Sequence, residues 1–284
     1  MTSSVKQPAS ARRRPWLGTS WKMNKTVGEA VDYARVLAQW AQTAHVDASV
    51  AILPPYTALA PVASVFQSLV TRVPVQVGAQ NMHWEDAGPH TGEISPVMVR
   101  DSGASVVEIG HFERRSACGE TDATVNQKVL AALRHSLSVV LCVGEDDATR
   151  DYGVVREFVG MQLKIALRGV AATSLGQLIV AYEPGWAIGN SGTSAPTEDV
   201  ADIHRYLRGV LTSLYGTHAA QARIIYGGSV SQQTAPRYAM APEIDGLFIG
   251  RAAWDVADFI RIIEAFCATR ARCGDSTAEV AECQ

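Results

Sequence analysis

The chain has 284 residues, of which 47% are hydrophobic and 19% charged, and its formal net charge is −3. This composition is typical of a globular protein, and so weak a negative charge gives no reason to expect a nucleic-acid partner. No uninterrupted apolar segment is long enough to cross a bilayer, so we expect no membrane partner either.

Short apolar runs alternate with longer amphipathic segments along the chain. The runs are apolar on both faces, as buried parallel strands are, and they span 16–21, 49–54, 75–80, 105–110, 138–144, 177–183, 222–227 and 246–250. Helical patterns lie between them at 28–43, 121–135, 154–167, 197–215 and 256–268. This alternation predicts an α/β protein built as a single (β/α)8 barrel. A doubly wound open sheet is the alternative, but no glycine-rich dinucleotide turn follows the first run.

The two ends of the chain differ from the barrel domain, which we expect to span residues 16–269. Residues 1–15 carry an arginine cluster with no apolar signal core after it, which predicts a disordered leader. Residues 270–284 are expected to form a short polar tail. The five cysteines are odd in number and lack CxxC spacing, which favours free thiols in a cytoplasmic protein.

Chemically active side chains stand where the apolar runs end, and in such a barrel these ends form the functional face. Glu183 ends the sixth run and precedes a Pro-Gly-Trp loop, an arrangement that suits a general base beneath a lid. A single strand-end glutamate is more often a solvated carboxylate. Here, further candidate site residues stand at or just after other strand ends, which favours the functional interpretation. They are Lys22, His111, Glu113, the turn at 227–229 and the pair Gly250-Arg251.

Five ordered motifs resemble the triosephosphate isomerase family: WKMN at 21–24, GEISP at 92–96, GHFERR at 110–115, AYEPGWAIG at 181–189 and YGGSV at 226–230. The resemblance implies a TIM barrel that isomerises a sugar phosphate through an enediolate, with no cofactor and no metal. It assigns the base to Glu183, the neutral hydrogen-bond donor to His111 and the fixed positive charge to Lys22, which Glu113 positions.

The same resemblance implies a phosphate site and a lid. The phosphate is expected at backbone amides of Gly189, Ser229, Gly250 and Arg251. Closure of loop 184–194, with Pro184, Trp186 and Gly192 in it, would exclude water from the intermediate.

The segment 81–92 is longer than most loops that join a strand to a helix. In the family this loop inserts into a partner subunit, so the resemblance implies a homodimer, with Thr91, Glu93 and Arg114 at the interface. A solvated surface loop is the alternative, against which exposed Met82 and Trp84 would argue.

Three positions depart from the usual motifs of the family. Ser20 stands in place of an asparagine, Phe112 in place of a serine, and Arg251 in place of the second glycine of a pair. Ser20 and Arg251 resemble the branch that acts on four-carbon sugars, the L-erythrulose-1-phosphate isomerases, which would make D-erythrulose 4-phosphate. An ordinary triosephosphate isomerase is the second hypothesis and a non-catalytic phosphate-binding barrel the third, while Phe112 fits neither branch.

Overall fold

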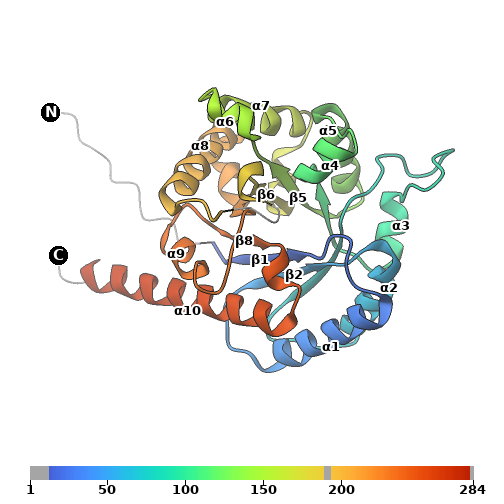
Figure 1. Ribbon diagram of the computed structural model, residues 1–284, viewed down its shortest axis with the longest axis horizontal. Helices are drawn as coiled ribbons and strands as arrows, with labels where there is room; N and C mark the ends of the chain where they lie inside the picture. The colour runs from blue at the N-terminus through green and yellow to red at the C-terminus, as the bar shows by residue number, and fades with distance from the viewer. Residues whose placement is uncertain (1–12, 189–192, 282–284) are drawn as a thin grey trace.

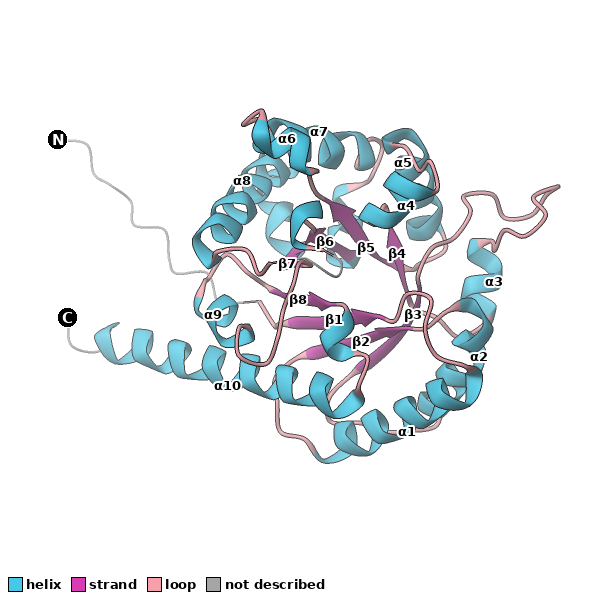
Figure 2. Cartoon of the chain, viewed as in Figure 1, coloured by secondary structure: helices cyan, strands magenta, loops and turns pink. Residues whose placement is uncertain are grey.

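In a computed structural model of the chain, which describes residues 13–188 and 193–281, eight parallel strands close into a barrel. Each strand pairs with its neighbour in chain order, and Trp16 of the first strand lies beside Gly246 of the last. Helices surround the ring of strands (Figure 2). The prediction of a (β/α)8 barrel is therefore confirmed. The strands are β1 (Trp16–Ser20), β2 (Ser49–Leu53), β3 (Val75–Ala79), β4 (Val106–Ile109), β5 (Ser138–Val143), β6 (Leu178–Tyr182), β7 (Arg223–Tyr226) and β8 (Gly246–Ile249).

The helices begin at side chains that satisfy their first free amides. Thr26 and Glu29 form a reciprocal capping box at the first long helix, and Thr121 caps the fifth helix. The helices are α1 (Val27–Thr43), α2 (Tyr56–Phe66), α3 (Pro96–Asp101), α4 (Phe112–Ala117), α5 (Asp122–Arg134), α6 (Asp147–Asp151), α7 (Val155–Ala166), α8 (Thr197–Tyr215), α9 (Ala235–Met240) and α10 (Val256–Ala281). Short 3-10 turns are η1 (Ala172–Gln177), η2 (Gly185–Ala187), η3 (Gly216–Gln221) and η4 (Arg251–Ala253).

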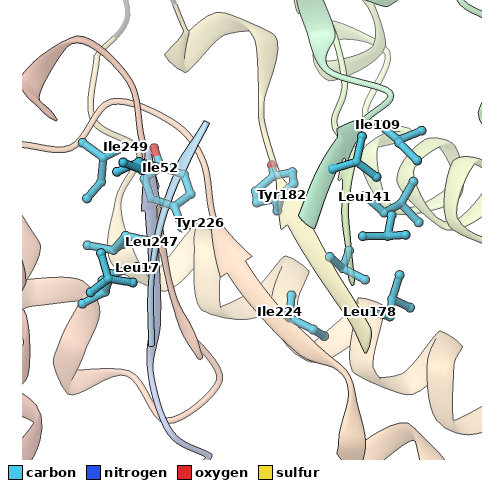
Figure 3. Packing of buried hydrophobic residues seen from close by; sticks show 14 of the residues in the cluster. Leu17, Ile52, Ile109, Leu141, Leu178, Tyr182, Ile224, Tyr226, Leu247 and Ile249 are labelled. Carbon is cyan, nitrogen blue, oxygen red and sulfur yellow. The ribbon is translucent and has the colours of Figure 1, made fainter. Parts of the chain in front are cut away.

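The strands bury both of their faces, which explains why they are apolar without alternation. One face packs against the helices, and Figure 3 shows part of this layer, including Leu17, Leu141 and Ile249. The other face fills the barrel interior with a smaller cluster that includes Trp16 and Phe248. A packed interior leaves the strand ends as the place for a site.

The chain ends differ in part from their expected form. Residues 1–12 lie outside the described part, but Arg13 already binds the barrel, since its Nε lies 2.9 Å from Oδ1 of buried Asp245. Helix α10 continues to Ala281, so residues 270–281 are helical, whereas we expected a polar tail. The segment has no proline, and Arg270 fixes its start by donating from Nη1 to the carbonyl of Ile244 at 2.7 Å.

None of the described helices combines the length and the apolar character that a bilayer span requires.

Candidate active site

A cavity of about 530 Å³ opens at the carboxyl ends of the strands. It brings together eight of the residues that the sequence predicted: Ser20, Lys22, His111, Glu113, Glu183, Ser229, Gly250 and Arg251. Two others, Gly189 and Gly192, lie outside the described residues. Pro184 and Trp186 lie directly after β6, beside the cavity, while Ala187 and Ile188 line it.

Lys22 is held at the mouth of the barrel by both its backbone and its side chain. Its φ of 54° lies in the left-handed region, where a side chain costs energy, and its carbonyl accepts from Nε2 of Gln80 at 3.1 Å. Its Nζ lies 2.7 Å from Oε1 of Glu113. The ammonium group is thereby fixed at the rim of the cavity. Gln80 was not predicted from the sequence, where its only signal is that a polar residue ends the third apolar run.

His111 caps helix α4, and this contact sets its tautomer. Its Nδ1 accepts from the backbone N–H of Glu113 at 3.1 Å, so this nitrogen carries a lone pair and not a proton. The ring is therefore a neutral imidazole with its proton on Nε2. That nitrogen lies 3.7 Å from Oε2 of Glu183.

Glu183 is 2% exposed and stands just past the end of β6. Its amide donates to the carbonyl of Val143 at 2.8 Å, which extends the sheet pairing by one residue. Two glycines make room for it. A Cβ at Gly227 would lie 2.6 Å from its Cγ, and a Cβ at Gly144 would lie 1.9 Å from its carbonyl oxygen. Oε2 of Glu183 has no hydrogen-bond partner and is left for another group.

Glu108 and Cys142 lie beneath the cavity and were missed by the sequence analysis. Both are buried. A carboxylate oxygen of Glu108 and the Sγ of Cys142 lie within 4.8 Å of each other and of a carboxylate oxygen of Glu183, which is close enough for the three to bind a metal ion together. Burial raises the pKa of the Cys142 thiol well above its usual value, so it stays protonated and is a poor metal ligand. We therefore assign no metal to this cluster. A lone acid inside the apolar run 105–110 was the available signal.

The base of the predicted lid is anchored by aromatic contacts. Nε1 of Trp186 donates to Oε1 of Glu145 at 2.8 Å, and the Arg150 guanidinium lies 4.1 Å from the centre of the indole ring. A Cβ at Gly185 would lie 2.6 Å from the ring of Phe112. This contact gives Phe112, unexplained from the sequence, a place against the first turn of the lid.

The comparisons with known proteins agree with this architecture. The sequence profile described as triosephosphate isomerase matches residues 15–266. The chain belongs to the triosephosphate isomerase family. A crystal structure of triosephosphate isomerase from Bartonella henselae superposes with a TM-score of 0.77 and 33% identity, covering 89% of this chain and 99% of that one.

Curated relatives in the triosephosphate isomerase family carry two different names. An L-erythrulose-1-phosphate isomerase of Rhizobium etli is 43% identical over 87% of this chain and 91% of its own length. A triosephosphate isomerase of Moorella thermoacetica is 42% identical over 88% of this chain and 98% of its own length. The chain is thus a sugar-phosphate isomerase of this family, and identity does not separate the two substrates.

Proposed function

We propose that this enzyme converts L-erythrulose 1-phosphate into D-erythrulose 4-phosphate. The observation that carries the proposal is that Ser20 and Arg251 line the same cavity as Glu183, His111 and Lys22. The four-carbon ketose has one hydroxymethyl group more than dihydroxyacetone phosphate, on the carbon that loses its proton. A serine at position 20 is shorter than the family's usual asparagine, and the space gained suits that extra group.

In the proposed reaction Glu183 is the base. Its carboxylate takes the proton from C3 of the substrate, and the electron pair of that C–H bond forms the enediolate while negative charge moves to the C2 oxygen. The Nε2–H of His111 donates a hydrogen bond to the oxygens, and the ammonium of Lys22 offsets their charge. The proton of the C3 hydroxyl passes to the C2 oxygen, and Glu183 returns the carbon-bound proton to C2. C3 then carries the ketone and C2 the hydroxyl.

The phosphate is assigned to the part of the cavity formed by the loops that follow β7 and β8. Ser229, Gly250 and Arg251 line the cavity there, and their backbone N–H groups are suited to an anion. Gly189, which lies outside the described residues, completes the proposed set. The Arg251 guanidinium adds a cation that a glycine would not supply. The lid that begins at Pro184 would close over this side and exclude water.

One comparison of substrates tests the proposal. The purified protein is given L-erythrulose 1-phosphate and dihydroxyacetone phosphate in separate assays, and kcat/KM is measured for each. A higher value for the four-carbon ketose supports the proposal. A higher value for the triose establishes the second candidate, which the Moorella thermoacetica relative favours. If neither substrate is turned over, both isomerase hypotheses fail and the third hypothesis, a non-catalytic phosphate-binding barrel, is favoured.

We also propose a homodimer formed through the loop 81–92. This loop extends away from the barrel between β3 and α3 (Figure 1), and residues 85–93 are exposed. Met23, at the mouth of the barrel, is 96% exposed and offers an apolar contact. Exposed Met82 and Trp84 would have argued against a solvated loop, but Met82 is buried and Trp84 half-buried within the subunit, so neither argues for the interface.

Ultracentrifugation of the intact chain and of a variant with residues 85–92 replaced by a short turn tests the dimer. We expect the intact chain to sediment as a dimer and the shortened one as a monomer, and an intact monomer would contradict the proposal. A cytoplasmic location belongs to the same proposal. Among the described residues, Cys118, Cys142 and Cys267 are free thiols, which suits a reducing compartment.

A further inference from the structure

Glu108 lies in the barrel interior directly beneath the proposed base. It belongs to β4 and is 2% exposed. The titratable and polar groups that face it come from the ends of three strands besides its own. They are the Ser20 hydroxyl and the Lys22 charge from the end of β1, the Cys142 thiol from β5, Glu183 from the end of β6, and His111 after β4 itself. The Ser20 hydroxyl faces the Glu108 carboxyl and lowers its pKa.

Within the described part of the chain, no lysine or arginine forms an ion pair with either of these two carboxyl groups. His111 Nε2 lies 3.9 Å from Oε1 of Glu108 and 3.7 Å from Oε2 of Glu183, but the ring is neutral because its Nδ1 accepts from a backbone amide. The nearest ammonium, that of Lys22, is 2.7 Å from the carboxylate of Glu113. Both carboxyl oxygens that face His111 lack hydrogen-bond partners.

Two buried carboxyl groups without a cation in contact do not both ionise readily, because each charge raises the free energy of the other. Of the two, Glu183 is the one that lines the cavity. We propose that Glu108 is a positioning residue that stays protonated beneath the cavity, so that the single buried negative charge resides on Glu183, and that its ionisation weakens the binding of phosphorylated ligands.

Electrostatics support this assignment. Burial, with the Glu183 charge adding to it, raises the pKa of Glu108 to about 7, although Ser20 and Lys22 oppose the rise, as a charged His111 would. Cys142 remains a neutral thiol over the same range, so it adds no charge. Above neutral pH the site would therefore hold two buried carboxylates. A sugar phosphate brings a further double negative charge, and the repulsion acts mainly on its binding.

The role of Glu108 is tested by ligand affinity across pH. The inference rests on the proposed function only in that the ligand is a phosphate ester. Glycerol 3-phosphate is a suitable probe because it binds as a sugar phosphate would and does not react. Its Kd is measured by calorimetry for the wild type and for Glu108→Gln, an amide of the same shape that cannot ionise, between about pH 6 and pH 9.

The ratio of the two Kd values at each pH cancels the titration of the ligand. We expect the ratio of wild type to variant to rise about tenfold from pH 6 to pH 9, which corresponds to one pKa unit of coupling. Glu108→Leu serves as the packing control, since it also removes the charge but loses the contact to Ser20. It should weaken binding at every pH while showing the same flat profile as the amide.

A ratio that stays constant within twofold would overturn the inference, and so would a failure of the probe to bind at all. The infrared spectrum of the wild type gives a second reading that requires no substitution. A protonated-carboxyl band that is present near pH 6, and lost by pH 9, is expected. The two proposals can fail separately. If the protein turns over no sugar phosphate, but its carboxyl band disappears by pH 9 and the Kd ratio rises as expected, the proposed function is refuted and the role of Glu108 is supported.

Discussion

The backbone amide of Glu113 donates to Nδ1 of His111 at 3.1 Å, while the carboxylate of the same residue lies 2.7 Å from the Lys22 ammonium. One residue in the first turn of α4 therefore aligns two groups of the proposed site. Its backbone sets which nitrogen of the imidazole carries the proton, and its side chain fixes the lysine.

The two functions of Glu113 can be separated by substitution. Glu113→Ala keeps the backbone amide and so the tautomer of His111, but it releases Lys22. We expect kcat to fall by about 10- to 100-fold, or roughly 1.4–2.8 kcal/mol, because the positive charge is no longer held in place. Steady-state kinetics measure the effect, with the exposed Glu157→Ala on α7 as control. Equal activity of the two variants would show that Lys22 needs no such support.

Glu183→Gln removes the proposed base while it preserves the shape of the side chain. We expect kcat to fall by about 10³- to 10⁴-fold, the usual size of general-base effects, with the affinity for glycerol 3-phosphate retained. Kinetics and calorimetry on the same preparation separate the two effects. An active Glu183→Gln enzyme would refute the assignment of the base.

The double variant Ser20→Asn, Arg251→Gly restores the residues that are usual in triosephosphate isomerases. It should shift the ratio of kcat/KM toward dihydroxyacetone phosphate by about tenfold or more, since a methylene-sized change in a pocket is worth roughly 1–3 kcal/mol. Each single variant is assayed on both substrates to find which position contributes. An unchanged ratio would mean that specificity lies elsewhere in the cavity.

Gly144 is required by the strand that carries Glu183. A Cβ there would lie 1.9 Å from the carbonyl oxygen of Glu183, a backbone atom that cannot rotate away. Gly144→Ala should therefore displace the end of β6 and reduce both stability and activity. Gly209→Ala in α8 is the matched control, because nothing lies within 4 Å of its added methyl group, and it should stabilise the protein by about 0.5–1 kcal/mol. Thermal unfolding compares the two.

The buried carboxyl of Glu108 also predicts how stability changes with pH. Its pKa is raised from 4.5 to about 7 on folding, so the native state holds this proton more tightly than the unfolded state. The contribution is fully present below about pH 4.5 and is lost as the pH rises through about 7, a change of about 3 kcal/mol. Glu108→Gln lacks this dependence. Urea unfolding of both proteins across this range should show their stability difference moving in favour of the variant as the pH rises, and parallel curves would contradict the expectation.

The sequence by itself determined the strands and the main residues of the site. Burial on both faces makes the strands continuous apolar runs. A charged or titratable residue at the end of a run, or directly after it, marks the strand exit, which is how Lys22, His111 and Glu183 are found. These are local properties. The extent of α10 was underestimated, because Gly274 in its distal half is typical of a helix end and a polar composition looks the same in a helix and in a tail.

Only the tertiary structure decided what lies around those residues. Closing the barrel places Glu108 and Cys142 of neighbouring strands beneath Glu183, brings Gln80 to the carbonyl of Lys22, and sets Phe112 against Gly185. Such contacts join residues that are 34 to 75 positions apart along the chain. The register of a closed sheet fixes which inward-facing side chains share a layer, and that register is a property of the whole barrel and not of any single segment.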